Sequence, residues 1–280
     1  MGMGQLGGSI ALAGRAAGLF DGVIGFGRHE DSLRRALALG LCDRISTSAV
    51  DAVVDADLVV LAAPLRAIPA VVEAMAPALR PGALVIDVGS VKGTAVRDIE
   101  AHLPPTVAFV PCHPLAGTEQ FGPEAARAEL FAGRRCLVCP TARTGAASLE
   151  RARALWHALG AEVVILSAEV HDRVMAAVSH LPHVAAYALA AALGGLPAEL
   201  ARAAHDLPTT SLRDTSRIAA SSPTMWRDIF LENRAALLPL VDALHAEVAR
   251  VREAIASNDE AAVLAFLEAG RAGRARILPG

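Results

Sequence analysis

The chain opens with Gly2-Met3-Gly4-Gln5-Leu6-Gly7-Gly8-Ser9, and this glycine-rich stretch indicates what kind of fold follows. Gly2, Gly4 and Gly7 form the pattern G-x-G-x-x-G, and the residues from Ile10 onward continue as a helix. In a dinucleotide-binding unit such glycines allow a tight turn, close approach of the backbone to a pyrophosphate, and close packing of the helix on a sheet. The helix N-terminus attracts the anion through its free N–H groups and its dipole. The cofactor-binding residues predicted here are Gly2, Gly4, Gln5, Leu6 and Gly7.

The strand that normally precedes this motif is missing, because only Met1 stands before Gly2. Such a strand lies in the middle of the sheet, and without it two neighbouring strands lack a hydrogen-bonding partner. We therefore expect Met1 to be an internal methionine. The natural start is expected roughly ten residues upstream, with a strand rich in Val and Ile.

The remaining first half alternates short apolar runs with helical stretches, which is typical of an α/β fold with a doubly wound, Rossmann-type parallel sheet. From about residue 168 the strand patterns vanish and helical periodicity continues almost to the C-terminus. We predict a dinucleotide-binding domain over 1–167 and an all-helical substrate and dimerisation domain over 168–280, whose apolar bulk favours a homodimer. The expected strands lie near residues 22–26, 57–63, 83–87, 106–110, 135–139 and 162–166.

Composition narrows the class of partner. The 280 residues carry a net charge of -3, which argues against nucleic acid or an anionic membrane as the main partner. The longest apolar stretch, near 184–196, is too short and too glycine-broken to span a bilayer, and no signal peptide is visible, so a cytoplasmic protein is expected. The four cysteines suggest ordinary buried thiols, and no metal site is predicted.

The residues after the second predicted strand bear on the choice of cofactor. Gly27 stands where an acid usually binds the ribose 2′-hydroxyl, and the neighbouring Arg28 suits a 2′-phosphate. This favours NADP slightly over NAD. Two alternatives stay open: Glu30 could act as a substitute acid, and Arg28 could be an ordinary surface charge.

The next strand ends carry further candidates. Ala63 and Pro64 are small enough for a nicotinamide ribose to approach, although they could equally form a plain strand exit. Ser90 is placed to offer a hydroxyl to a substrate, with an N-cap as the simpler alternative. Lys92 could hold an anion or cap the next helix. His113, followed by a proline at a strand end, is a candidate acid–base residue.

The helical half contains a histidine pair and an arginine-rich segment. His180 and His183 share a helix face, but no carboxylate or cysteine stands at a spacing that would favour a metal. The segment around Arg217 and Trp226 is polar and aromatic, and an arginine beside a cleft is the natural clamp for a carboxylate. Ordinary surface ion pairing is the alternative for these arginines.

Together these segments resemble the prephenate/arogenate dehydrogenase family of tyrosine biosynthesis. The glycine loop alone is weak evidence, but the full set of motifs occurs in the family's order and spans nearly the whole chain. The motifs are Gly2–Ser9, Asp87–Gly93, His113–Glu119, Ser179–His183, Arg213–Ala219 and Met225–Ile229.

The resemblance implies an oxidoreductase that decarboxylates prephenate, arogenate or both, with hydride transfer to NAD(P). By the same resemblance, His113 is the catalytic residue that hydrogen-bonds the substrate's ring hydroxyl, assisted by Ser90. Arg217 holds a substrate carboxylate, with Glu119 as its ionic partner. His183 and Thr118 line the substrate pocket, Trp226 packs behind it, and His180 orients its neighbours.

Two other functions remain possible from the sequence. One is a β-hydroxyacid dehydrogenase, but such enzymes usually rely on a lysine in the helical domain, and the absence of any lysine after Lys92 argues strongly against it. The other possible function is that of a truncated, weakly active or non-catalytic nucleotide-binding homologue. No residue discriminates prephenate from arogenate, since the two substrates differ only by a keto or amino group.

Overall fold

The computed structural model describes residues 1–118, 120–207 and 209–278, and it contains two compact units. The first unit, Met1–Arg234, holds every strand and the helices α1 to α10. The second unit, Ala235–Gly280, consists of α11 (Arg234–Ala256) and α12 (Glu260–Ile277). Asp259 caps α12 by accepting a hydrogen bond from the N–H of Ala262.

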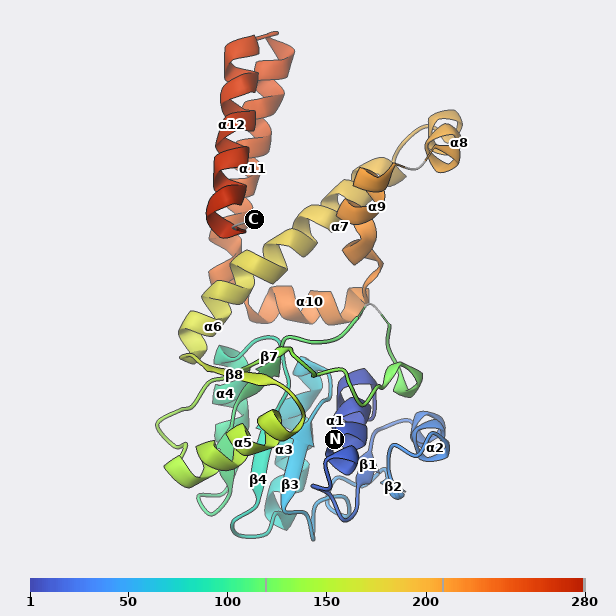
Figure 1. The fold of residues 1–280 in the computed structure, drawn as a ribbon, viewed down its shortest axis with the longest axis vertical. Helices are drawn as coiled ribbons and strands as arrows, with labels where there is room; N and C mark the ends of the chain where they lie inside the picture. The colour runs from blue at the N-terminus through green and yellow to red at the C-terminus, as the bar shows by residue number, and fades with distance from the viewer. Residues whose placement is uncertain (119, 208, 279–280) are drawn as a thin grey trace. The chain divides into compact units, whose positions relative to one another are not determined.

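The strands confirm the predicted α/β architecture (Figure 1). One sheet pairs β1 with β2, a second follows the order β3-β4-β5, and all of these pairs are parallel. A third sheet pairs β6 antiparallel with β7, and β7 parallel with β8. The bounds are β1 (Ile24–Phe26), β2 (Arg44–Ser46), β3 (Leu58–Leu61), β4 (Leu84–Asp87), β5 (Ala108–Val110), β6 (Cys112–Pro114), β7 (Arg135–Val138) and β8 (Glu162–Ile165).

Two of these strands, β2 and β6, are not among those expected from the sequence. Each is three residues long, so neither shows a hydrophobic run that a pattern can detect. The consequence matters for the site: His113, expected in a loop beyond a strand, lies inside β6 and is held by its pairing with Leu137.

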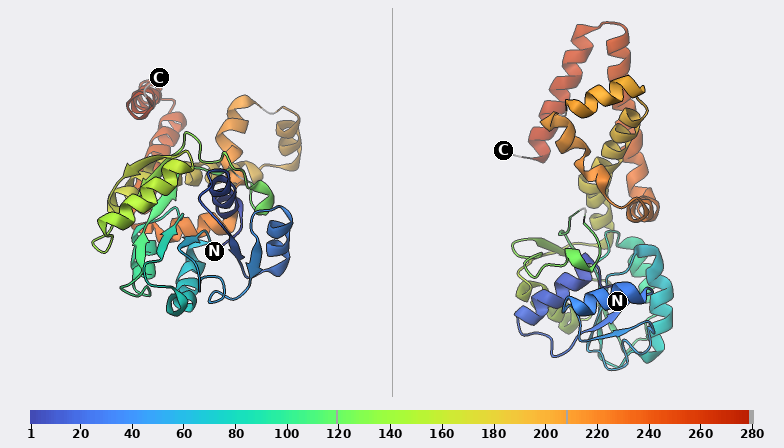
Figure 2. Two further views of the ribbon diagram at one scale, coloured as in Figure 1. Left: turned by 60° about the horizontal axis from the view of Figure 1, so that its bottom comes forward. Right: turned by 90° about the vertical axis from the view of Figure 1, so that its right-hand side faces the viewer.

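Helices cover both faces of the strands (Figures 1 and 2). Alternate residues of β4 enter different cores: Leu84 and Ile86 pack in a cluster with α5, whereas Val85 packs in a cluster with α3 and α4. Because β4 is buried on both faces, it is apolar from Leu84 to Ile86, and its last residue is the buried carboxylate Asp87. The helical elements that precede β8 in the chain are α1 (Gln5–Ala16), α2 (Glu30–Ala38), η1 (Leu65–Ala67), α3 (Ile68–Met75), η2 (Ala76–Ala78), α4 (Gly93–Glu100), η3 (Pro123–Ala125) and α5 (Ala146–Ala158).

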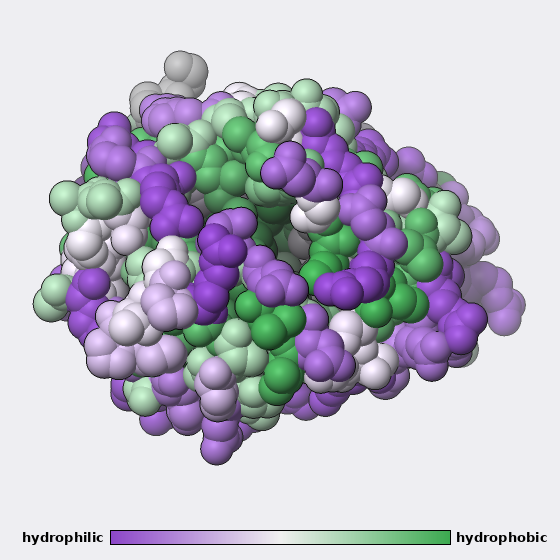
Figure 3. Space-filling view, turned by 90° about the horizontal axis from the view of Figure 1, so that it is seen from below, coloured by the Kyte–Doolittle hydropathy of each residue, from purple (hydrophilic) through white to green (hydrophobic). Residues whose placement is uncertain are grey.

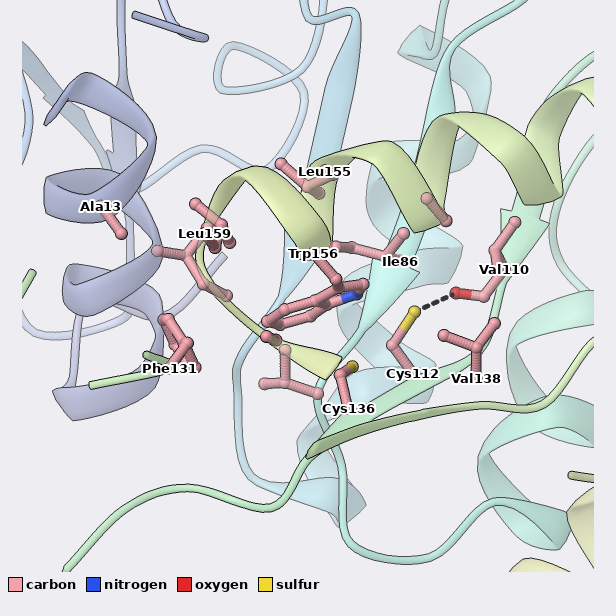
Figure 4. Packing of buried hydrophobic residues seen from close by; sticks show 14 of the residues in the cluster. Ala13, Ile86, Val110, Cys112, Phe131, Cys136, Val138, Leu155, Trp156 and Leu159 are labelled. Atoms are coloured by element: carbon pink, nitrogen blue, oxygen red, sulfur yellow. Dashed lines mark hydrogen bonds between the residues drawn. The ribbon is translucent and has the colours of Figure 1, made fainter. Parts of the chain in front are cut away.

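The α5 cluster is centred on Trp156, whose ring meets Phe131 edge to face at 5.4 Å (Figure 4). Cys112 and Cys136 are buried in the same cluster, and the Cys112 thiol donates to the carbonyl of Val110 at 3.3 Å. Burial also raises the pKa of Cys139, to about 12. The cysteines thus behave as small apolar core residues, as predicted.

A single helical run from Ala168 to Gly194 follows β8. The proline at position 182 lacks a backbone N–H, and the π-helical turn η4 directly before it accommodates the broken hydrogen-bonding pattern. The segments are α6 (Ala168–Met175), η4 (Ala176–His180), α7 (Leu181–Gly194), α8 (Ala198–Asp206), α9 (Thr210–Ser216), η5 (Arg217–Ala220) and α10 (Pro223–Glu232).

By length and composition this run could cross a membrane, which the shorter apolar stretch near 184–196 did not indicate. One such helix is weak evidence, because core helices pass the same test. Its buried face carries His171 and His180, and Asp172 beside them bonds the backbone of Lys92. Polar groups of this kind are costly in lipid, so the contacts fit a helix packed on its own protein.

Candidate active site

The glycine loop has the geometry that a dinucleotide requires. Gly2 has φ +93°, and a Cβ there would lie 2.5 Å from the carbonyl oxygen of Ala62. A Cβ on Gly7 would lie 2.0 Å from the carbonyl oxygen of Gly2, whereas a Cβ on Gly4 meets nothing within 4 Å. The three positions therefore supply a turn, an open side for a phosphate at the start of α1, and close packing. These residues fit the cofactor.

Gln5, the first residue of α1, is tied to the loop that follows β6. Its side-chain nitrogen donates to the hydroxyl of Thr118 at 2.8 Å, and the Thr118 N–H donates to the Gln5 side-chain oxygen at 3.0 Å. Gly117, with φ +120°, lets this loop pass close to Gln5. The side chain of Gln5 thus joins the predicted cofactor loop to the predicted substrate loop.

The other predicted cofactor residues lie at strand ends. Arg28 is exposed just beyond β1, and Glu30 pairs with Arg34 at 2.7 Å in the first turn of α2. Ala63 is half-buried beyond β3, and Pro64 precedes η1.

Beneath the end of β4 lies a fully buried ion pair between Lys92 and Asp87. The Lys92 ammonium also donates to the carbonyl of Cys112 at 2.8 Å, and Asp87 accepts from the N–H groups of Gly89 and Cys112. Charges excluded from water in this way must be paired and hydrogen-bonded. Lys92 occupies the N-cap position of α4, but its side chain makes no capping hydrogen bond. The side chain points into the protein, where the anion that it holds is the Asp87 carboxylate rather than a ligand, and it joins β4 to β6.

The half-buried Ser90 is free to meet a ligand. Its hydroxyl has no hydrogen-bond partner among the described residues, and it is not a helix cap, since the N-cap position of α4 belongs to Lys92. Both oxygens of Asp172 accept from the first N–H groups of this helix, at 2.7 Å from Lys92 N and 2.7 Å from Gly93 N. The simpler N-cap interpretation of Ser90 is therefore wrong.

His113 heads a hydrogen-bonded chain that the sequence did not reveal. Its Nδ1 lies 2.8 Å from Nε2 of His171, whose Nδ1 lies 2.8 Å from Asp172 Oδ1. The carboxylate accepts the proton on His171 Nδ1, so His171 Nε2 accepts the proton on His113 Nδ1. The remaining nitrogen of His113, Nε2, is thereby left as an acceptor. The adjacent His-Asp pair in α6 was the available signal, but nothing in the sequence places it beside β6.

The electrostatics keep His113 neutral at physiological pH. Burial lowers the pKa of His113 well below its usual value of 6.5, and His171 and the Lys92 cation lower it further. Burial also lowers the pKa of His171, opposed by the hydrogen bond to Asp172. Both imidazoles are thus available as neutral hydrogen-bonding groups.

The two histidines of the helical run, His180 and His183, lie in different surroundings. Trp226 of α10 stacks on His183 with ring centroids 3.5 Å apart, and the Nδ1 of His183 bonds the carbonyl of Ser179 at 2.9 Å. His180 is buried, bonds Asn233 at 3.0 Å, and has its pKa lowered by burial to about 4. His183 is therefore the one that can meet a ligand.

Arg217 begins η5, and its side chain is exposed. Burial lowers the pKa of His183, and the positive charge of Arg217 lowers it further. Glu119, the predicted ionic partner of Arg217, lies outside the described residues. Across the described part of the chain, no group of three or more His, Cys, Asp or Glu side chains could hold a metal ion.

The glycine loop, the parallel strands and the neutral histidine beyond them define a dehydrogenase of the nicotinamide-dinucleotide class. Two family models match: "Prephenate dehydrogenase, nucleotide-binding domain" over residues 10–165, and "Prephenate dehydrogenase, dimerization domain" over residues 167–269. The chain belongs to the prephenate dehydrogenase family, whose members are oxidoreductases.

Individual relatives agree. Cyclohexadienyl dehydrogenase of Zymomonas mobilis is 40% identical over 259 residues, which cover 92% of this chain and 88% of the relative. Prephenate dehydrogenase of Bacillus subtilis is 32% identical over 259 residues, which cover 92% of this chain and 70% of the relative. A structure of prephenate dehydrogenase from A. aeolicus, in complex with hydroxyphenyl propionate and NAD+, matches with a TM-score of 0.87 and 33% identity. The match covers 99% of this chain and 96% of that chain. The fold class and the family predicted from the motifs are confirmed, and the roles of single residues stay predictions.

Proposed function

We propose that this protein catalyses the oxidative decarboxylation of prephenate, arogenate or both, with NAD(P) as hydride acceptor. The observation that carries this proposal is the acceptor nitrogen of a neutral His113, set by His171 and Asp172. The relatives named above include a cyclohexadienyl and a prephenate dehydrogenase. A structure named Synechocystis arogenate dehydrogenase also has this fold, with 26% identity, TM-score 0.78, and 99% of this chain and 98% of that one covered.

The protein forms no covalent bond with the substrate in this reaction; its residues orient the substrate and stabilise the transition state. The substrate is a cyclohexadienol that bears a carboxylate opposite its hydroxyl, and loss of carbon dioxide makes its ring aromatic. When bound, NAD(P) accepts the hydride from the hydroxyl-bearing carbon. His113 accepts the hydrogen bond of the substrate hydroxyl through Nε2, which stabilises the carbonyl-like carbon formed in the transition state. Such a contact typically contributes about 10²–10⁴-fold in rate. Ser90 offers a second hydrogen bond to the same oxygen.

Positioning falls to residues of both halves of the site. Arg217 binds a substrate carboxylate with two parallel charge-assisted hydrogen bonds. The pairing of Glu119 with this arginine stays a prediction from the family resemblance. Thr118 and His183 line the pocket, and Trp226 fixes the ring of His183 by stacking. His180 holds the helix in place rather than touching substrate, since it is buried.

For the cofactor, Gly2, Gly4 and Gly7 with the N–H groups of Gln5 and Leu6 receive the pyrophosphate, and Ala63 and Pro64 border the nicotinamide ribose. The exposed Arg28 in place of a ribose-binding acid favours NADP slightly over NAD. NAD+ is the dinucleotide in the A. aeolicus complex.

We propose a cytoplasmic homodimer in which the substrate and dimerisation domain begins near residue 168, between β8 and α6. The support for dimerisation is the matched dimerization domain together with exposed apolar side chains at one-turn spacing on α6 and η4. These are Val170, Val174 and Val178.

One experiment tests the activity. The purified protein is mixed with prephenate or arogenate and with NAD or NADP, and the nicotinamide absorbance is followed in all four combinations. Reduction in at least one combination, strongly lowered by His113→Asn without loss of cofactor affinity, is expected. Folded protein that reduces nothing in any combination would refute the proposal, and unchanged turnover in the variant would remove His113 from the mechanism.

A further inference from the structure

Gln5, the first residue of α1, holds Thr118 through both ends of its side-chain amide. The N–H of Thr118 can only donate, so the group that accepts it at 3.0 Å is the amide oxygen of Gln5. The amide nitrogen is thereby turned toward the Thr118 hydroxyl and donates to its oxygen at 2.8 Å. This Gln5–Thr118 contact fixes the position of Thr118 relative to the start of α1.

The same contact leaves the hydroxyl of Thr118 as a donor. Its oxygen accepts from the Gln5 amide and also from the N–H of Gln120, at 3.2 Å. A hydroxyl has two acceptor lone pairs and one proton. Both lone pairs are occupied here, and among the described residues the proton makes no hydrogen bond. Thr118 is therefore set to donate to a ligand, which suits a carboxylate or carbonyl oxygen of the substrate.

The backbone beside Thr118 does not hold this position by itself. Gly117 has φ +120°, and a glycine restricts its own conformation less than any other residue. Further along the chain, the buried Ser9 hydroxyl accepts from the N–H of Arg127 at 2.9 Å and holds that part of the segment on α1. Thr118 itself is joined to α1 through the side chain of Gln5.

Gln5 faces the predicted cofactor site through its backbone. α1 begins at Gln5, after Gly4, without a side-chain cap and without an acidic residue in its first turn. The first N–H groups of a helix have no partner within the helix, so they are available to an anion. The N–H of Gln5 is the first of them. One residue thus borders the pyrophosphate with its backbone and holds Thr118 with its side chain.

The Gln5–Thr118 contact lies on the ligand-binding side of the strands. The glycine loop before Gln5 contacts Phe26 and Ala62, at the carboxyl ends of β1 and β3. Ligands of open α/β sheets bind at these ends. The hollow seen from below in Figure 3 includes the first residues of the same strands, Ile24 and Leu58, in its lining. The contact therefore belongs to the predicted site rather than to that hollow.

We propose that Gln5 is a positioning residue that couples the two binding sites, because its amide holds Thr118 as a hydrogen-bond donor to the substrate. The first ligand to bind restricts Gln5 and Thr118, so the second ligand loses less conformational entropy, and each strengthens the binding of the other. The two neutral hydrogen bonds account for about a fivefold coupling factor. This inference rests on the proposed function for the identity of the substrate.

The test compares the natural protein with three variants. Gln5→Met removes both hydrogen bonds at similar side-chain length, whereas Thr118→Ser keeps the hydroxyl and the N–H. Arg35→Met is the matched control, since it removes an exposed ion pair with Glu124 in the segment after Thr118, at 2.8 Å. Hydrogen exchange at the Thr118 amide is measured without ligands. Calorimetry gives the affinity for NAD(P) with and without the aromatic product, 4-hydroxyphenylpyruvate or tyrosine according to the substrate turned over. Steady-state assays give KM and kcat.

In the natural protein the product is expected to tighten NAD(P) binding by about fivefold, and in Gln5→Met this factor falls below about twofold. Exchange at Thr118 becomes at least about threefold faster in Gln5→Met, and the substrate KM rises by more than kcat falls. Thr118→Ser and Arg35→Met retain most of the coupling. An equal coupling factor in Gln5→Met, unchanged exchange at Thr118, or loss of coupling in Arg35→Met would overturn the proposal.

Failure of this inference is distinguishable from failure of the proposed function. A natural protein that turns over neither substrate refutes the proposed function. Unchanged exchange at Thr118 or unchanged coupling in Gln5→Met, in a protein that does turn over substrate, refutes only the role of Gln5.

Discussion

Replacing His171 by leucine tests the hydrogen-bonded chain behind His113, the proposed catalytic residue. The change removes the acceptor of the His113 Nδ1 proton and leaves Asp172 with its two backbone donors at the start of α4. His113 itself remains, but its tautomer is no longer set. The variant therefore separates orientation of the imidazole from its presence.

The structure sets the expected size of the effect. A neutral hydrogen bond contributes about 0.5–1.5 kcal/mol, which corresponds to roughly twofold to tenfold in rate. We expect kcat to fall by about tenfold, well short of the roughly 10²–10⁴-fold expected for loss of the base. Since His171 also lowers the pKa of His113, its removal raises that pKa toward 6.5. The neutral, active form is lost as the pH falls through this pKa, so the acid limb of the profile moves to higher pH.

The assay is a pH profile of kcat and kcat/KM between about pH 5 and 9 for the natural protein, His171→Leu and His171→Gln. The natural protein should keep its activity to well below pH 6.5, and the glutamine variant should recover much of the rate, because its amide oxygen can accept from His113 Nδ1. A leucine variant with kcat within about twofold of the natural enzyme and an unshifted acid limb would refute the reasoning.

Three further changes test separate features. Lys92→Met leaves the buried Asp87 carboxylate unpaired and should lower the free energy of unfolding by about 3–5 kcal/mol in urea titrations, with a loss under about 1 kcal/mol contradicting the role of the pair. Gly7→Ala places a Cβ 2.0 Å from the Gly2 carbonyl oxygen, so it should abolish NAD(P) binding in calorimetry and lower the melting temperature. Gly4→Ala should weaken NAD(P) binding and leave the melting temperature unchanged. Equal behaviour of the two variants would be evidence against the assigned glycine roles. Arg217→Ala should chiefly raise the substrate KM and leave cofactor affinity intact, and an unchanged KM would exclude it from carboxylate binding.

Much of this protein could be predicted from local sequence. The glycines at positions 2, 4 and 7 indicate the phosphate loop, because a Cβ at Gly2 or Gly7 would clash with the backbone, and the absence of a side chain at Gly4 leaves the start of α1 open. Long apolar runs such as Asp57–Ala63 identify buried strands, since a strand covered on both faces excludes polar side chains. The spaced motifs around His113, His183 and Arg217 point to the family because they lie in one order along the chain.

The contacts that complete the site join residues far apart in sequence, and no local pattern carries them. His171 lies 58 positions from His113, and Lys92 turns inward because Asp87 and the Cys112 carbonyl surround it. The short strands β2 and β6 form through pairing with neighbours rather than through their own hydrophobicity. Hydrogen bonds and burial between distant segments are properties of the folded chain. For that reason a glycine motif predicts a cofactor site, whereas the hydrogen-bonded chain behind His113 follows only from the packing of the folded protein.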